Sequence, residues 1–154
     1  MSYQSFEQVL QKCHTEEKEF WRVILEDDMA ERNVSEEDSM EHMRATWDAM
    51  LLAAATYEGN LNSSSGLVGG DGRRMEEYIR SAQTKSLCGE YVDTCIAGAL
   101  QMGESNACMK RIVAAPTAGA CGVLPAVLVP YFQKRCKDTD KILKSMYVAA
   151  GIGQ

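Results

Sequence analysis

Every long stretch of this chain places its apolar residues at the spacing of an α-helix, and none alternates convincingly as a β-strand would. Residues 5–31 follow this pattern and predict one long amphipathic helix. A second helix is predicted from residue 35 to residue 54, because Ser35 and Asp38 form a variant of the capping box. We therefore expect an all-α fold of about six amphipathic helices joined by Gly-rich loops.

The remaining predicted helices cover residues 73–81, 87–102, 122–134 and 139–150. The helix over 87–102 has a run of apolar residues on one side, Cys95 among them, and we expect that side to be core. Asp138 is the predicted N-cap of the last helix. At 154 residues the chain fits a single helical domain, which we divide into a helical hairpin over residues 1–57 and a loop-rich part over 58–154.

The sequence also indicates a cellular compartment. It contains no run of about 18 apolar residues that would cross a membrane. Its first residues lack the basic and apolar regions of a signal peptide. We therefore expect a cytoplasmic protein, in which the six cysteines are free thiols or metal ligands rather than disulfides.

Charge is distributed unevenly along the chain, which has a net charge of −6. Residues 1–60 contain 5 basic and 14 acidic residues, a net charge of −9. Residues 61–154 contain 11 basic and 8 acidic residues, a net charge of +3. This balance argues against a nucleic-acid partner, whereas the second half is compatible with a small anionic substrate or an anionic cluster.

A turn-rich segment of glycine and serine covers residues 59–72. Its hydroxyl groups and exposed backbone amides could bind a carboxylate or a phosphate in front of the helix over 73–81. The segment matches neither the P-loop nor the dinucleotide fingerprint, because the first requires a lysine and the second a preceding strand. An anion site and a Gly/Ser linker without a function therefore both stay open.

The segment over residues 114–125 surrounds a single thiol, Cys121, with small residues. Pro116 disfavours a helical Ala115, while Gly119 and Gly122 permit positive φ or a close approach of the backbone. The loop is predicted to deliver Cys121 to a helix start, where the helix dipole favours the thiolate that binds metal or attacks a substrate. The ordinary alternative is a buried core cysteine, since cysteine is among the most buried residue types.

Three segments resemble one enzyme family: residues 65–71 (SGLVGGD), 85–89 (KSLCG) and above all 112–125 (IVAAPTAGACGVLP). The chain resembles, along its whole length, the N-terminal half of the alpha chain of bacterial iron-sulfur-dependent L-serine dehydratase. The three segments are the most specific part of this resemblance. The resemblance implies that the chain is part of a larger helical catalytic domain. The chain departs from the family pattern at Lys110, where the family usually has glycine. It also lacks the Ser-Ser-Ser-His-Thr motif of the family's beta chain, because Gly66 follows Ser65.

The resemblance implies an L-serine ammonia-lyase of amino-acid degradation and gluconeogenesis, which deaminates L-serine to pyruvate and ammonia with a 4Fe-4S cluster as Lewis acid. By this resemblance Cys121 is one of three cysteine ligands of the cluster, and the other two lie C-terminal to the matched segment. Ser65, Gly66 and Thr117 are the candidate contacts to L-serine, and the catalytic base is not identified. The implied partner is a serine dehydratase beta chain, in an oligomer that binds neither nucleic acid nor membrane.

Two other functions stay open on the sequence. The chain could be a non-catalytic helical interaction module or an inactive fragment that packs on a partner subunit. A redox thiol protein acting through Cys121 is the weakest alternative, because no resolving cysteine lies nearby in the sequence. We expect the isolated chain to be inactive, to bind no stable cluster and to expose apolar surface near Gly151 and Ile152.

Overall fold

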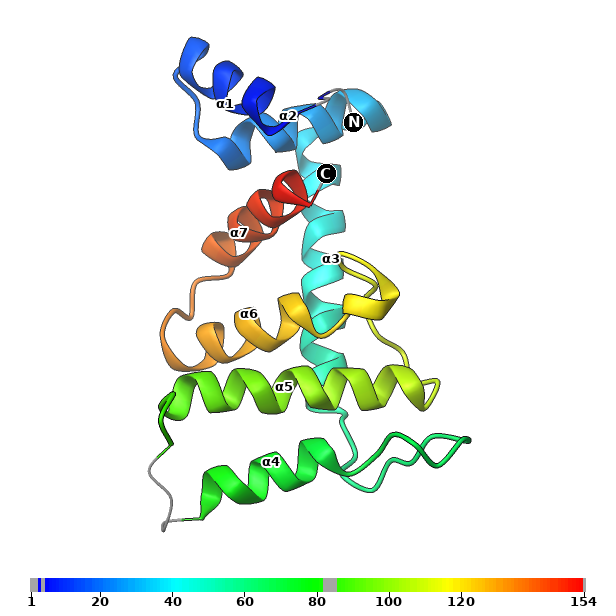
Figure 1. Cartoon of the computed structure of the whole chain (residues 1–154). Coiled ribbons are helices and arrows are strands. Elements are labelled where there is room, and N and C mark those ends of the chain that lie inside the picture. Colours follow the sequence, from blue (N-terminus) through cyan, green and yellow to red (C-terminus); the bar gives the residue numbers. More distant parts are fainter. Residues whose placement is uncertain (1–2, 4, 82–85, 154) are drawn as a thin grey trace. The chain divides into compact units, whose positions relative to one another are not determined.

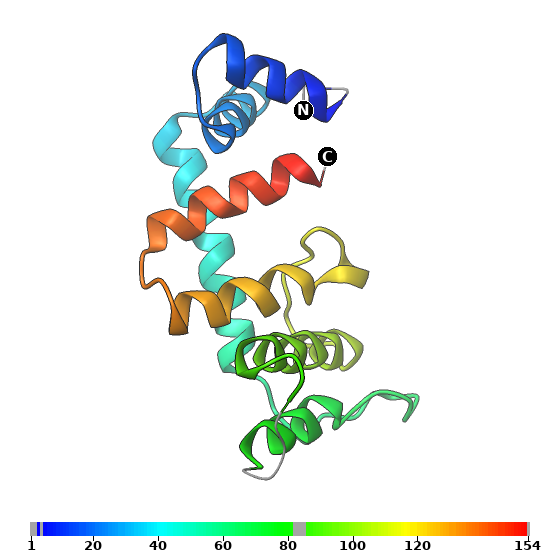
Figure 2. The same cartoon turned by 60° about the vertical axis from the view of Figure 1, so that its left-hand side comes forward.

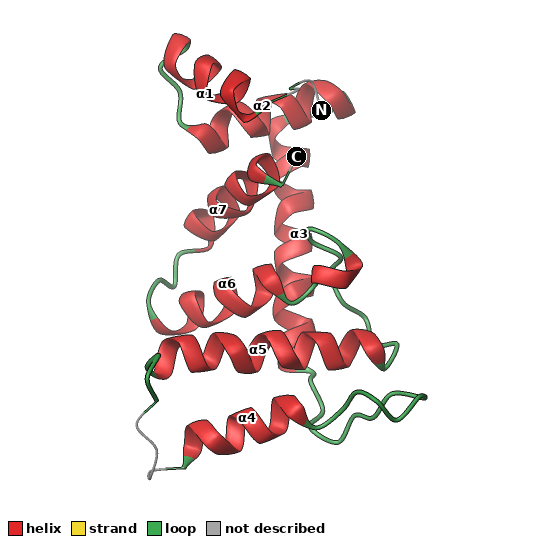
Figure 3. Ribbon diagram, in the orientation of Figure 1, coloured by secondary structure: helices red, strands yellow, loops and turns green. Residues whose placement is uncertain are grey.

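The computed structural model describes residue 3, residues 5–81 and residues 86–153. Over these residues it contains α-helices, one short 3-10 helix (η1) and no strand, which confirms the all-α prediction (Figure 3). None of the helices found there is long and apolar enough to span a membrane. The elements are α1 (Phe6–Thr15), α2 (Phe20–Arg32), α3 (Glu36–Ala55), α4 (Asp71–Arg80), α5 (Glu90–Ala107), η1 (Ala118–Ala120), α6 (Val123–Lys134) and α7 (Thr139–Ile152).

The chain forms two compact units. The terminal unit comprises Met1–Trp47 and Asp138–Gln154, and the central unit comprises Asp48–Lys137. The terminal unit has its core where α1, α2 and α7 meet, and its buried residues are Val9, Val23, Ile24, Leu25 and Tyr147. The central unit contains all the candidate site residues, Ser65, Gly66, Thr117 and Cys121.

The prediction of one helix over residues 5–31 is wrong, because the structure has two helices there. The chain turns at Glu17, whose φ of 52° is left-handed, and the Lys18 N–H donates to the Cys13 carbonyl at 3.0 Å. The turn lets α1 fold back on α2, so that the Phe6 and Phe20 rings lie 5.5 Å apart. Apolar spacing continues through the turn, and periodicity alone therefore does not show it.

The predicted capping box at the start of α3 is confirmed. The Ser35 N–H donates to Asp38 Oδ2 at 3.2 Å, and the Asp38 N–H donates to Ser35 Oγ at 3.1 Å. The predicted cap of the last helix is confirmed as well, because Asp138 Oδ1 accepts from the Lys141 N–H at 3.3 Å.

Replacing Ser35 by alanine is expected to destabilise the terminal unit by about 1 kcal/mol, because α3 loses an N-cap acceptor. Urea unfolding followed by circular dichroism measures the change. Thr46→Ala is the matched control, since the Thr46 hydroxyl only donates to the His42 carbonyl of its own helix. Equal midpoints for Ser35→Ala and the wild type would contradict a stabilising cap.

In the central unit, α5 lies between α4 and α6 and packs against both (Figures 1 and 2). Small residues allow the approach of α6, since a Cβ added at Gly98 would lie 3.4 Å from the Ala126 Cα. The buried side of α5 is mixed, with polar as well as apolar residues. Its buried residues are Asp93, Ala97, Met102, Glu104 and Ser105.

The prediction that the apolar face of α5 is core is wrong for the part of the chain that the structure describes. Ile96 is 41% exposed, Val92 and Leu100 are exposed to a similar degree, and Cys95 is only partly buried. Helical periodicity identifies this apolar face correctly, but burial requires another segment to cover it. The side of α5 that packs on its neighbours carries two carboxyl groups instead.

Candidate functional site

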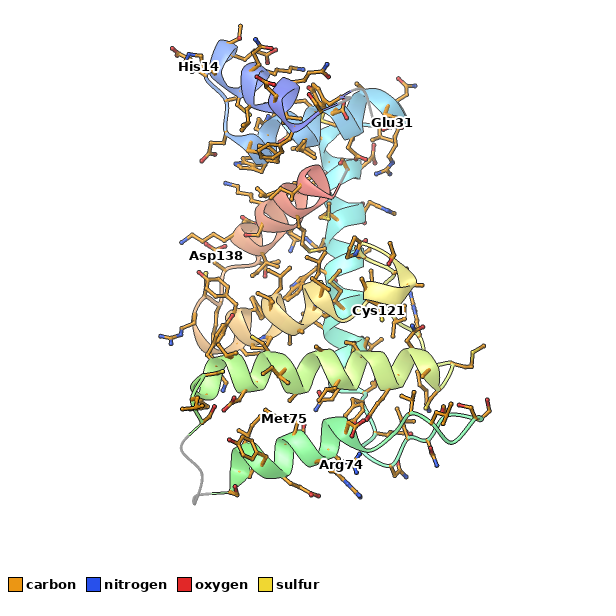
Figure 4. The ribbon with its side chains drawn as sticks, in the orientation of Figure 1. His14, Glu31, Arg74, Met75, Cys121 and Asp138 are labelled. Carbon is orange, nitrogen blue, oxygen red and sulfur yellow. The ribbon has the colours of Figure 1, made fainter. Side chains whose placement is uncertain are left out.

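Cys121 lies at the end of the loop that joins α5 to α6, where the chain enters α6 (Figure 4). The Ala115–Pro116 peptide bond in this loop is cis. Thr117 caps η1, because its Oγ1 accepts from the Ala120 N–H at 3.2 Å. The Asn106 side chain on α5 donates to the Ala118 carbonyl at 2.9 Å and so fixes the loop to that helix.

Gly122 confirms the predicted close approach of the backbone. A Cβ added there would lie 3.0 Å from the Ala99 carbonyl oxygen and 3.3 Å from the Ala99 Cα, both of which are backbone atoms of α5. Gly119 has no such neighbour, since only the Thr117 Oγ1 at 3.9 Å comes near. The glycine directly after Cys121 is therefore the one that brings the thiol against α5.

The Cys121 thiol is buried, with 2% of the residue exposed. Its Sγ lies 3.8 Å from the Met102 carbonyl oxygen, in the geometry of a thiol donor. Burial raises the pKa of Cys121, because the charged form loses its hydration there. The direction of this pKa shift is opposite to the thiolate-favouring effect expected of a helix start.

A hollow of about 540 Å³ lies between α5 and α6 beside Cys121. Its walls are mainly apolar, and Val123 is 55% exposed along it. The hollow is also lined by a second cysteine and by further apolar residues, among them Cys95, Val92, Ile96, Ala126 and Val127. Cys121 therefore lies at the border of an apolar hollow and not in the middle of a closed core.

Cys121 is expected to react with iodoacetamide on the order of 100-fold more slowly than Cys88 in the folded free chain, because thiolate content and access both limit alkylation. Cys88 is exposed and serves as the internal reference. Peptide-resolved mass spectrometry at pH 8 measures both rates, and unfolding in urea should bring them together. Equal rates in the folded chain would contradict the burial of Cys121.

Ser65 and Gly66 lie at the tip of a second loop, over residues 58–70. The base of the tip is closed by the Ser63 N–H, which donates to the Val68 carbonyl at 2.8 Å, and by the Gly66 N–H, which donates to the Ser63 carbonyl at 2.8 Å. Leu67 beside them is 87% exposed. Ser65 and Gly66 are thus held on an ordered turn whose outer side is open.

Gly69 shows why this loop needs glycine. Its φ is 153°, and an added Cβ would lie 2.3 Å from the Leu61 carbonyl oxygen. Any other residue would collide with the backbone of the opposite side of the loop. The segment is therefore a loop with its own internal backbone contacts, and whether it has a function stays open at this point.

The start of α4 does not offer the anion site that the sequence left open. Glu104 Oε1 accepts the backbone N–H groups of Asp71 at 2.5 Å and Gly72 at 3.0 Å. These are donors that an incoming carboxylate or phosphate would need. Glu104 also accepts the Tyr57 hydroxyl at 2.5 Å, and the pKa of Tyr57 is raised by burial and by this contact.

Three polar side chains of α5 hold the three segments that carry the family resemblance. Asp93 accepts the Ser86 hydroxyl at 2.8 Å, Glu104 holds the start of α4, and Asn106 holds the loop of Cys121. Lys85 of the middle segment lies outside the described residues. Sequence reasoning missed all three anchors, and the sequence alone does not separate the buried acids Asp93 and Glu104 from the exposed acid Glu90 on the same helix.

The structure brings some of the predicted site residues together and keeps others apart. Thr117 and Cys121 belong to one loop, whereas Ser65 and Gly66 belong to the loop on the other side of α5 (Figures 1 and 2). Both loops lie at the end of the helical layer where α5 finishes and α4 and α6 begin. Within the described ranges, no group of three or more His, Cys, Asp or Glu side chains could hold a metal ion.

Comparison with known proteins identifies the family. The family model for the serine dehydratase alpha chain matches residues 15–154. The chain is 30% identical to an L-serine dehydratase alpha chain of Peptoniphilus asaccharolyticus, over 96% of this chain and 50% of the relative. It is 30% identical to a probable L-serine dehydratase alpha chain of Bacillus subtilis, over 85% of this chain and 43% of the relative. No solved structure matches the chain significantly.

These relatives are longer than the chain, which spans about half of their length. An L-serine dehydratase of Haemophilus influenzae is 29% identical over 97% of this chain but only 33% of its own length. The family model and the relatives agree on one assignment over nearly the whole chain. The chain belongs to the serine dehydratase alpha chain family.

Proposed function

We propose that this chain forms part of an L-serine dehydratase that converts L-serine to pyruvate and ammonia. The observation that carries the proposal is the family match over residues 15–154, which includes both candidate loops. The ordered loop tips at one end of the helical layer support it, because a small polar substrate needs fixed donors and acceptors. Ser65, Gly66 and Thr117 are the residues we assign to contacts with L-serine.

We assign Cys121 as one ligand of a 4Fe-4S cluster. A soft sulfur ligand at the border of an apolar hollow suits an iron-sulfur cluster. A single thiol does not hold such a cluster, however, and the described residues contain no group of three or more His, Cys, Asp or Glu side chains that could hold a metal ion. We therefore assign the remaining ligands to polypeptide outside the described residues. When bound, a cluster with an open iron position supplies Lewis acidity for the loss of a hydroxyl group.

The partner we propose is a serine dehydratase beta chain, in an oligomer. The name alpha chain, which the family model and two relatives carry, supports a second kind of subunit. The exposed apolar face of α5 and α6 also supports packing against further polypeptide, since apolar surface of this kind commonly marks an interface.

Anaerobic co-expression tests the proposed function. The chain is produced with any coding sequence that continues it and with a neighbouring beta chain, and pyruvate is measured after addition of L-serine. We expect pyruvate formation that depends on L-serine and on iron. An assembly with a full complement of iron that forms no pyruvate from L-serine would contradict the proposal.

A non-catalytic interaction module is the second candidate, and the same exposed face of α5 and α6 favours it. The co-expression experiment separates the two functions. A module is expected to co-purify with its partner, with neither iron nor pyruvate formation.

A further inference from the structure

Glu104 is a buried carboxyl group to which the proposed function assigns no role. It lies in the last part of α5, and only 2% of the residue is exposed. Its two oxygens accept hydrogen bonds from Asp71 N–H, Gly72 N–H and the Tyr57 hydroxyl. Burying a carboxyl group is costly unless hydrogen bonds compensate for its lost hydration, so the position of Glu104 depends on these three donors.

The three donors stand at the two ends of one loop. Tyr57 directly precedes residues 58–70, while Asp71 and Gly72 directly follow them. A single side chain on another helix therefore closes the loop from both ends. Closing a loop in this way removes conformational freedom that the 13 residues between would otherwise keep.

The start of α4 depends on the same contacts. Glu104 satisfies two of the first N–H groups of α4, those of Asp71 and Gly72, and the Tyr57 hydroxyl donates to the same carboxyl group. Gly72 leaves the space for this arrangement, because an added Cβ would lie 2.8 Å from the Tyr57 hydroxyl oxygen. Helix start and loop end are thus fixed by one cluster of polar atoms.

We propose that Glu104 is a positioning residue, which fixes the loop tip at Ser65 and Gly66 by holding both ends of the loop. The inference deepens the proposed function and rests on it for one point, namely that the tip contacts L-serine. The hydrogen bonds that Ser63 makes with Val68 and Gly66 then connect the fixed ends to the tip, because they make residues 63–68 a closed turn.

Hydrogen exchange followed by mass spectrometry tests the clamp on the 154-residue chain itself. In Glu104→Ala, exchange over residues 58–72 is expected to be about tenfold faster, because two backbone donors and one hydroxyl lose their acceptor. Tyr57→Phe should accelerate the same peptides, since it removes one end of the closure. Glu104→Gln should stay within about threefold of the wild type, because its amide oxygen still accepts and its amide nitrogen donates to Tyr57.

Glu90→Ala is the matched control, because Glu90 is an exposed acid on the same helix that pairs with Lys134. It should leave exchange over residues 58–72 unchanged. Unchanged exchange there in both Glu104→Ala and Tyr57→Phe overturns the proposal. An equal acceleration in all helices of the central unit by Glu104→Ala, together with no effect of Tyr57→Phe, overturns it as well.

Steady-state kinetics of the assembled enzyme provide a second measurement, which a purely structural role of Glu104 would not change. We expect Tyr57→Phe to raise KM for L-serine about tenfold with kcat changed less than about twofold, since a displaced tip weakens binding. A fall in kcat at unchanged KM overturns the positioning role. If the wild-type assembly forms no pyruvate at all, the proposed function fails, and the exchange experiment still decides whether Glu104 holds the loop.

Discussion

Replacing Cys121 by serine in the assembled enzyme is expected to lower L-serine dehydratase activity by more than about 100-fold and to remove the bound iron. Substitution of a residue that only hydrogen-bonds to a metal ligand already lowers metal affinity or activity by up to about 100-fold. Loss of the ligand itself should lower them further. The serine hydroxyl is also a poor substitute, because it is a hard oxygen that stays protonated. Pyruvate formation and iron content, measured anaerobically on one preparation, test this result.

Two cysteines provide controls for this experiment. Cys95→Ser, on the outer face of α5 near the same hollow, should keep iron and activity. Cys88→Ser should do the same, because Cys88 is exposed on the segment before α5. Full iron content in Cys121→Ser would show that this residue is not a ligand. Loss of iron in Cys95→Ser would instead identify a ligand that the present assignment omits.

Replacing Gly122 by valine is expected to destabilise the central unit by about 2 kcal/mol and to reduce the iron content of the assembled enzyme. The new Cβ would meet the Ala99 carbonyl oxygen at 3.0 Å, and backbone atoms of α5 yield less readily than the end of a side chain. The start of α6 should therefore move away from α5, and Cys121 should move with it. Thermal unfolding of the 154-residue chain measures the first effect and iron analysis the second.

Gly119→Ala is the matched control for this substitution, because Gly119 belongs to the same loop. Its added Cβ would find only the Thr117 Oγ1 at 3.9 Å, so the change should alter stability by less than about 0.5 kcal/mol. If Gly122→Val and Gly119→Ala behave alike, the close approach to Ala99 does not determine the position of Cys121.

Local sequence rules were sufficient where the physical cause is itself local. The capping box at Ser35 and the cap at Asp138 were predicted because a side chain there bonds to a backbone N–H three residues away. The all-α class followed from periodicity, which reports how side chains group around a helix. The motif around Cys121 was recognisable as well, since its glycines and proline constrain the backbone directly.

Tertiary structure decided the features that depend on segments far apart in the chain. Periodicity predicted an apolar face for α5. It could not show that this face is exposed, because burial depends on which helix covers which side. The raised pKa of the Cys121 thiol likewise follows from its burial, which local sequence does not show.

The sequence by itself therefore determined the helical class, the helix caps and the family of this protein. Only the tertiary structure decided that Glu104 binds both ends of the loop that carries Ser65, and that Asn106 fixes the loop of Cys121. The physical reason is that each of these hydrogen bonds joins residues distant in sequence, and no local pattern encodes which distant donor a buried acceptor will meet.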